Sequence, residues 1–269
     1  MNLMDIDGVG IEVHRIAGPA GPDPLAPLVF LHEGLGSAAM WRDWPRQLCA
    51  ATGRAGVVIS RRGYGRSDPV PDVRADPSEQ AGRRCGRLRP DYMHREAWEV
   101  MPALLAKLGI DHPVLVGHSD GGTIALLYAS RHPVAACIVM APHVIVEDLS
   151  IAAIMQAREA FQSGGLRERL ARFHADVDGA FWQWNDIWLS EDFRAFDIRE
   201  DCRRITAPLL ALQGVDDPYG TMAQIDEIAA NAPHTRLLKL PGCGHSPHRD
   251  QPAAVNDAIR AFLNEPRPA

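Results

Sequence analysis

The sequence lacks the features that mark membrane-spanning, disulfide-rich and nucleic-acid-binding proteins. Nowhere in its 269 residues do about 18 apolar residues run together. The five cysteines are scattered and form no CxxC pair, so we expect neither a disulfide framework nor a zinc site. The net charge is −6, and the local basic stretch at 83–89 is too short to predict a nucleic-acid-binding face. We therefore expect the partner to be a small-molecule substrate rather than nucleic acid or a membrane.

The first residues also lack the pattern of a secretory signal. Acidic Asp5 and Asp7 stand where such a signal has a basic region, and no uninterrupted apolar run follows them. We expect a cytoplasmic protein with reduced thiols. Apolar residues make up 46% and charged residues 23%, which is typical of a globular chain, and the length suits one α/β domain with an insertion. Oligomeric state cannot be predicted from these properties.

Short apolar segments alternate with longer stretches of helix-forming composition. The candidate strands are 27–33, 55–60, 113–118, 136–142, 207–214 and 235–242, and the candidate helices are 38–52, 92–108, 120–131, 221–231 and 252–263. This alternation predicts an α/β fold with a mostly parallel central sheet flanked by helices. The segment around 11–16 is expected to add an antiparallel hairpin at the edge of the sheet.

Two stretches interrupt the alternation. Residues 69–90 are rich in proline and arginine, which predicts a surface loop. Residues 144–205 show helical periodicity of apolar side chains and no candidate strand, so we expect a helical lid inserted between two strands. The chain then divides into a core, 1–143 and 206–269, and a helical lid, 144–205.

The segment 117–121 (GHSDG) fits the pattern G-x-S-x-G and lies between a candidate strand and a candidate helix. In that context the serine, Ser119, occupies a strained turn whose flanking positions have no room for a Cβ atom. The strained turn exposes the hydroxyl and predicts a nucleophile. The five-residue pattern alone also fits an ordinary glycine-rich turn.

Two further candidates follow Ser119 along the chain, each directly after a candidate strand. Asp216 and Asp217 follow 207–214, and His245 follows 235–242. The carboxyl ends of parallel strands meet at one edge of a sheet, which is where open α/β sheets place their sites. The order Ser, Asp, His therefore predicts a nucleophile, an orienting acid and a general base. His248 could suggest a metal pair with His245, but no third ligand is recognisable, and we expect a solvent or loop hydrogen-bonding role for it.

The loop 32–37 (HEGLGS) follows the first candidate strand of the parallel sheet. Such a loop can supply a backbone N–H group to an oxyanion hole. By position, Gly34 is one expected donor, and Asp120, the residue after Ser119, is the other. A plain glycine turn is the alternative interpretation of this loop.

These segments together resemble the lidded α/β-hydrolase superfamily: HEG at 32–34, RGYGRS at 62–67, the 117–121 turn, GVDD at 214–217 and GH at 244–245. The resemblance covers about 27–263 and implies an α/β-hydrolase fold in which Asp217 is the orienting acid. A serine at position 119 resembles the nucleophile of esterases, thioesterases, carbon–carbon bond hydrolases and cofactor-free perhydrolases. Dehalogenases and epoxide hydrolases have aspartate there. Glu33 departs from the family, which commonly has glycine at this position, and we expect it to tune the site or to face an arginine such as Arg62.

The resemblance implies a carboxylesterase-like serine hydrolase that cleaves an ester, thioester or related carbonyl bond without a metal or organic cofactor. His245 would take the proton of Ser119, the serine would attack the carbonyl, and water would resolve the acyl-enzyme. Trp182, Trp184 and Trp188 could line a pocket for an apolar or aromatic substrate, or attach the lid to the core.

Three alternatives stay open. The same triad could hydrolyse a carbon–carbon bond. The segment 34–39, followed by Arg61 and Arg62 after the next strand, resembles a dinucleotide fingerprint and suggests an NADP-dependent oxidoreductase, although Ala39 stands where the third glycine belongs. A hydrolase scaffold could also serve as a non-catalytic small-molecule receptor.

Overall fold

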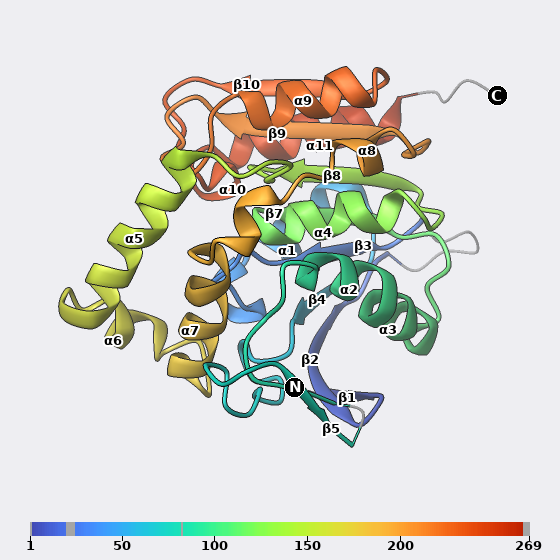
Figure 1. Ribbon diagram of the computed structural model, residues 1–269. Helices are drawn as coiled ribbons and strands as arrows, with labels where there is room; N and C mark the ends of the chain where they lie inside the picture. The colour runs from blue at the N-terminus through green and yellow to red at the C-terminus, as the bar shows by residue number, and fades with distance from the viewer. Residues whose placement is uncertain (1, 20–24, 82, 266–269) are drawn as a thin grey trace.

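The apolar segments assemble into an eight-stranded sheet at the centre of the computed structural model, which describes residues 2–19, 25–81 and 83–265 (Figure 1). The strand order is β1-β2-β4-β3-β7-β8-β9-β10. All pairs from β4 to β10 are parallel, and β1 and β2 form the antiparallel edge hairpin. All six candidate strands and the edge hairpin are confirmed. The strand bounds are β1 Asn2–Ile6, β2 Val9–Ile16, β3 Leu28–Leu31, β4 Gly56–Ser60, β7 Val114–His118, β8 Ala136–Met140, β9 Leu209–Gly214 and β10 Arg236–Leu240.

Successive residues of each inner strand point to opposite faces of the sheet, so each face has its own buried core. Val29 and Leu31 belong to one core, whereas Leu28 and Phe30 belong to the other. The first face is covered by α2 (Tyr92–Arg95), η2 (Glu96–Val100), α3 (Met101–Leu108), α4 (Asp120–Ala129), α8 (Arg199–Cys202) and α9 (Ala223–Asn231). The second face is covered by η1 (Ala38–Trp41), α1 (Trp44–Thr52), α10 (Pro247–Asp250) and α11 (Pro252–Asn264).

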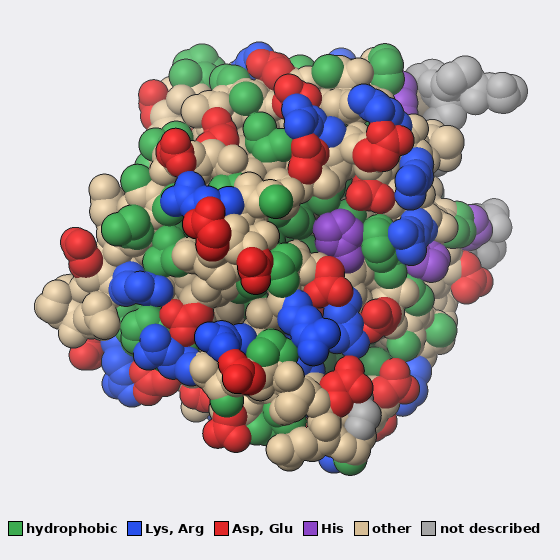
Figure 2. All heavy atoms as spheres, in the orientation of Figure 1, with side chains coloured by type: hydrophobic (Ala, Val, Ile, Leu, Met, Phe, Trp, Pro, Cys, Tyr) green, Lys and Arg blue, Asp and Glu red, His purple; other side chains and the backbone are tan. Residues whose placement is uncertain are grey.

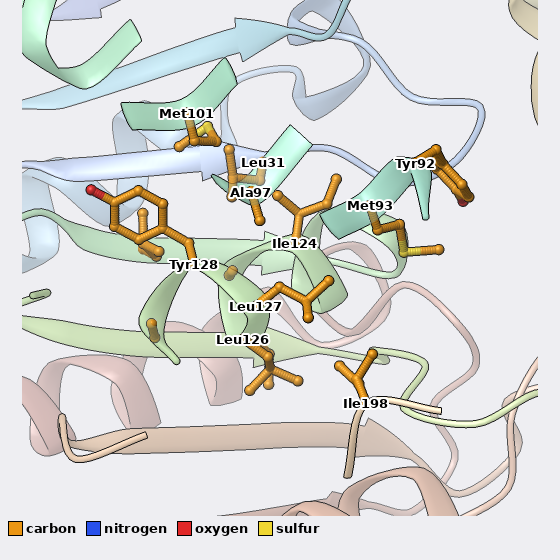
Figure 3. Close-up of a cluster of buried hydrophobic side chains, with 14 of the residues drawn as sticks. Leu31, Tyr92, Met93, Ala97, Met101, Ile124, Leu126, Leu127, Tyr128 and Ile198 are labelled. Carbon is orange, nitrogen blue, oxygen red and sulfur yellow. The ribbon is translucent and has the colours of Figure 1, made fainter. Parts of the chain in front are cut away.

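Helix α4 is buried on every side, because it lies between the sheet and the segment α2–η2–α3. Figure 3 shows Ile124 and Leu127 of α4 among Met93, Ala97 and Leu31, all of which are at most 1% exposed. A helix that is apolar all round needs such an enclosed position. The packing holds the start of α4, and with it the serine that precedes the helix.

Two of the predicted helices are interrupted. The segment 38–52 splits into η1 and α1, because Arg42 has a positive φ of 55° between them. The segment 92–108 passes through the π-helical turn η2 before Pro102. Pro102 lacks the N–H group that would donate to the carbonyl of Trp98 in a continuous α-helix, and the π turn η2 lies at that break.

Residues 69–90 are not wholly a loop, so that part of the prediction was wrong. They contain the two-stranded antiparallel hairpin β5 (Ser78–Gln80) and β6 (Arg83–Cys85). Its strands are too short for alternation to be recognised in the sequence. The hairpin contacts the β1–β2 turn, where Arg83 Nη1 donates to Gly8 O at 2.8 Å.

The segment between β8 and β9 is helical, as predicted. It contains α5 (Asp148–Ser163), α6 (Leu166–Leu170), α7 (Val177–Trp188), the 3-10 helix η3 (Asp192–Ala195) and α8. Helices α5, α6 and α7 lie to one side of the sheet in Figure 1, whereas α8 packs against α4 and α9. In the described chain, the only β pairing of the segment between β8 and β9 is the isolated bridge between Ile145 and Asp197. The division into a core and a separate lid at 144–205 stays a prediction.

All five cysteines are free and buried. Within the described ranges, every helix is too short or too polar to cross a membrane.

Candidate active site

Ser119 lies in the sharp turn between β7 and α4, with φ 51° and ψ −121°. A Cβ atom at Gly121 would lie 2.0 Å from Leu31 O, and one at Gly117 would lie 2.3 Å from Gly121 O. Only glycine fits these two positions. Ser119 itself is held in a backbone region that non-glycine residues avoid, and such strain is concentrated at functional sites. The turn therefore has the geometry expected of a nucleophile.

His245 and Asp217 meet at the carboxyl ends of β9 and β10. His245 Nδ1 lies 2.9 Å from each carboxylate oxygen of Asp217. The same carboxylate accepts from Tyr219 N and Gln213 Nε2, each at 2.8 Å. Burial raises the pKa of Asp217, but the hydrogen bonds and the His245 charge outweigh it and leave the pKa below its usual value. Asp216 is exposed, so the geometry agrees with the choice of Asp217 as the partner of His245.

Within the described residues, Ser119 Oγ makes no hydrogen bond. Hydrogen bonds between a nucleophile and its base are often long in unliganded enzymes and tighten when substrate binds. The His245 ring is enclosed by three other rings, with centroid distances of 4.7 Å to Tyr219, 5.1 Å to His118 and 6.0 Å to His143. These contacts restrict where the imidazole can turn.

His118 connects His245 to Glu33. His118 Nε2 donates to the backbone carbonyl of His245 at 2.7 Å, and its Nδ1 lies 3.4 Å from Glu33 Oε2. Burial raises the pKa of Glu33, but His118 and Arg249 outweigh this effect and hold the pKa well below its usual value. The prediction that Glu33 faces Arg62 was wrong, since the guanidinium nearest the Glu33 side chain is that of Arg249, at 3.9 Å.

The loop after β3 is held by hydrogen bonds to its backbone. Glu33 O accepts from His32 Nδ1 at 2.7 Å and from Arg61 Nη2 at 3.0 Å. The carbonyl of Glu33 and the N–H of Gly34 belong to the same planar peptide, so these bonds also fix the direction of that N–H group. A Cβ at Gly34 would lie 2.1 Å from Trp184 Nε1, which shows how closely α7 covers the loop. The oxyanion role of Gly34 stays a prediction.

Asp120, the other predicted N–H donor, has its side chain in a buried polar network. Tyr92 OH donates to Asp120 Oδ2 at 2.7 Å, and Trp188 Nε1 donates to Tyr92 OH at 3.1 Å. Arg61 Nη2 lies 3.7 Å from the same carboxylate oxygen. Burial raises the pKa of Asp120 despite the Arg61 charge. Arg61 thus contacts both segments that carry the predicted oxyanion donors.

The three tryptophans of α7 have different surroundings. Trp184 covers Gly34, and Trp188 packs against His143 with a centroid distance of 4.9 Å. Trp182 is partly exposed and stacks under the Arg74 guanidinium at 4.1 Å. The rings that Trp182 contacts are those of Phe161 and Phe181, in α5 and α7. A pocket role remains a prediction for all three, and the contacts of Trp184 and Trp188 link those two to the site.

Sequence reasoning missed His143. It lies in the loop just past the end of β8, is 3% exposed, and its Nδ1 is buried without a hydrogen bond in the described chain. Burial and the nearby His245 lower its pKa to about 3, so it is neutral near pH 7. Its place after a strand end was the available signal, the same signal that identified Asp217 and His245.

The expectation for His248 was wrong. It is 2% exposed and packs against the stacked rings of Trp41 and Trp44, with centroid distances of 4.8 and 5.1 Å. Its Nδ1 makes no hydrogen bond to the described residues. Among those residues, no group of three or more His, Cys, Asp or Glu side chains is arranged to hold a metal ion.

Residues 28–258 match the model of the Alpha/beta hydrolase family. The chain belongs to that family. It is 24% identical over 277 residues to mouse sn-1-specific diacylglycerol lipase ABHD11, covering 90% of this chain and 82% of the lipase. It is 27% identical over 285 residues to the putative carbamate hydrolase RutD of Caulobacter sp. (strain K31), covering 96% and 97%.

Solved structures support the same fold. The enol-lactonase of Burkholderia xenovorans LB400 superposes with a TM-score of 0.73 at 18% identity, covering 98% of this chain and 100% of the lactonase. The proline iminopeptidase of Mycobacterium smegmatis also gives 0.73 at 18% identity, covering 97% of each chain. The chain has the α/β-hydrolase fold, and its family and named relatives identify it as a hydrolase.

Proposed function

We propose that this hydrolase uses Ser119 as a nucleophile, His245 as the general base and Asp217 as the acid that orients the histidine. One observation carries the proposal: the strained serine turn and the His245–Asp217 pair lie at the same edge of the sheet, in the loops that follow three of its parallel strands. Family membership supports it independently.

In the proposed reaction, His245 Nε2 accepts the Ser119 proton while Ser119 Oγ attacks the substrate carbonyl carbon. The negative charge that develops on the carbonyl oxygen is stabilised by the N–H groups of Gly34 and Asp120. His245 then protonates the leaving group. In the second half of the reaction, His245 takes a proton from water while the water oxygen attacks the acyl carbon, and His245 then gives that proton to Ser119 Oγ as the acyl product leaves. Asp217 keeps the Nδ1 proton in place throughout both halves.

The substrate class that fits best is a small ester, thioester or related carbonyl compound with an apolar or aromatic acyl part. Trp184 and Trp188 present large apolar surfaces next to Gly34 and His143. The related lipase, carbamate hydrolase and lactonase differ in the bond they are named for, so the surroundings of Ser119 rather than the nucleophile itself would determine specificity.

The oxidoreductase alternative is weakened by the loop after β3. A dinucleotide fingerprint requires the glycine-rich turn to open directly into a helix. Here the turn leads only into the four-residue 3-10 helix η1, and α1 begins later, at Trp44.

The test is hydrolysis of p-nitrophenyl acetate and longer acyl esters by wild type, Ser119→Ala and the matched control Ser163→Ala, whose serine lies at the exposed end of α5. We expect Ser119→Ala to lower kcat by at least about a thousandfold, because alanine has no hydroxyl group to attack the carbonyl carbon. Ser163→Ala should retain the wild-type rate. Equal rates for wild type and Ser119→Ala would refute the proposal.

A further inference from the structure

A cavity of about 240 Å³ lies apart from the triad residues, between the loop after β4, the β5–β6 hairpin and the α2–η2 segment. Seven arginines line it: Arg61, Arg62, Arg83, Arg84, Arg87, Arg89 and Arg95. Figure 2 shows Lys and Arg side chains gathered in the lower half of that view, between α7 and β1. Ser119, Asp217 and His245 are absent from its lining.

Four hydrogen-bond donors around this cavity are buried without a partner in the described chain. They are Arg61 Nε, Arg62 Nε, Tyr64 OH and Gln183 Nε2, and all four residues line the cavity. The orientation of the Gln183 amide is determined, because its Oε1 accepts from Arg84 Nη2 at 3.0 Å. Buried donors nearly always have an acceptor in native proteins. A group of them around one cavity points to a ligand that brings oxygen acceptors.

Four of the seven arginines form no ion pair with a carboxylate of the described residues, and Arg62 and Arg84 are two of them. Arg62 forms no side-chain hydrogen bond or ion pair with the described residues, and Arg84 donates only to Gln183 Oε1 and Gly86 O. Burial, and then the Arg62 charge, lower the pKa of Arg84 to about 10. Both arginines line the same cavity, and partly buried guanidinium charges repel one another unless an anion offsets them.

The acidic side chains of the cavity do not supply that anion. Glu79 and Glu99 are engaged by Arg95. Glu96 lies near Arg61 and Arg84, but among the described residues it forms no hydrogen bond or ion pair with Arg62 or Arg84, and burial raises its pKa.

The other nearby acids act from outside the cavity or from its exposed rim. Asp68 acts on Arg62 only at longer range, and its carboxylate accepts from Gly10 N. Asp7 and Asp91 are exposed.

We propose that this cavity binds a small organic anion whose carboxylate or phosphate group lies between Arg62 and Arg84 and accepts from Gln183 Nε2. Planar guanidinium groups bind both oxyanions with paired hydrogen bonds. The volume equals that of roughly eight water molecules, which leaves room for an organic part beyond the charged group. This binding goes beyond the proposed hydrolysis and does not depend on Ser119.

A bound anion would connect three segments that are distant in the sequence: Arg62 after β4, Arg84 in β6 and Gln183 in α7. Because such a ligand binds only the folded chain, it should raise the melting temperature in a saturable way. Arg61 lines the cavity and donates to Glu33 O, so the site lies beside the predicted oxyanion loop.

The experiment measures the melting temperature and calorimetric binding with succinate in one arm and inorganic phosphate in the other, at ionic strength held constant with KCl. We expect saturable binding in at least one arm, and the stronger arm identifies the headgroup chemistry. Arg62→Gln and Arg84→Gln should each weaken binding tenfold or more. Arg260→Gln, which removes the same charge from an exposed position on helix α11, should leave it unchanged.

Circular dichroism shows whether each variant still folds. Arg62 makes no side-chain hydrogen bond in the described chain, so its replacement should leave the circular dichroism spectrum unchanged. Gln183→Glu places a carboxylate in the cavity and should also abolish anion binding. Ser119→Ala should bind as wild type does, which separates this site from the hydrolase proposal. Absence of saturable binding in both arms, or wild-type affinity in Arg62→Gln and Arg84→Gln, would overturn the inference.

Discussion

Replacing Asp217 with asparagine preserves the shape of the side chain but removes one acceptor oxygen. The carboxylate now accepts from three N–H groups, those of His245, Tyr219 and Gln213. An asparagine offers one oxygen and an NH₂ group, so its NH₂ must face at least one of these donors. If it faces His245, the imidazole can respond only by moving its proton from Nδ1 to Nε2. That is the atom which should accept the proton of Ser119.

We therefore expect Asp217→Asn to lower kcat by about three to four orders of magnitude, the size seen when the orienting acid of a serine protease is neutralised. An unmatched buried donor should also cost about 1–3 kcal/mol of unfolding free energy. Asp216→Asn is the matched control. Its side chain is exposed, so its stability should stay within about 0.5 kcal/mol of wild type and its kcat within about twofold.

The assay is the initial rate at saturating p-nitrophenyl ester, with circular dichroism and urea unfolding run on the same preparations. If Asp216→Asn were the inactive variant and Asp217→Asn were near normal, the orienting acid would have been misassigned by one residue. If both kept normal kcat, His245 would not depend on a carboxylate at all.

Two further predictions follow from the surroundings of Gly34 and Glu33. Trp184→Ala should change the ranking of acyl chain lengths in kcat/KM while leaving fluorophosphonate labelling of Ser119 intact. Truncating a buried tryptophan costs roughly 3–5 kcal/mol of stability, and Trp184→Phe is the control for that loss. An unchanged ranking would make Trp184 structural only. Glu33→Gln should lower the unfolding free energy at pH 7 by about 1–3 kcal/mol. Because the pKa of Glu33 in the folded protein lies below its unfolded value of about 4, the difference in unfolding free energy from wild type should shrink as the pH falls below 4. A difference that does not change with pH would argue against a charged Glu33.

The sheet could be predicted because its inner strands are buried on both faces and therefore appear as continuous apolar runs, such as 28–31 and 136–140. The serine turn could be predicted because its geometry demands glycine on both sides. The hairpin at 78–85 could not, since three-residue strands carry no readable alternation. The π turn before Pro102 depends on packing against α4 as well as on the local sequence.

The predicted site residues follow strand ends, and the hydrogen bond between His245 and Asp217 agrees with that rule. The network around Asp120 could not be foreseen, because Arg61, Tyr92 and Trp188 come from three separate segments that only the folded chain brings together. The partner of Glu33 was missed for the same reason, since Arg249 is more than two hundred residues away in the chain. Such contacts depend on tertiary structure rather than on local pattern.

The central claim is that Ser119 is the nucleophile, and covalent labelling tests it most directly. The protein would be treated with a fluorophosphonate, and the adduct would be measured by intact-protein mass spectrometry and located by peptide mapping. The account predicts one added group, on Ser119, with no labelling of Ser119→Ala. An adduct on another residue of wild type, or equal labelling of Ser119→Ala, would contradict it.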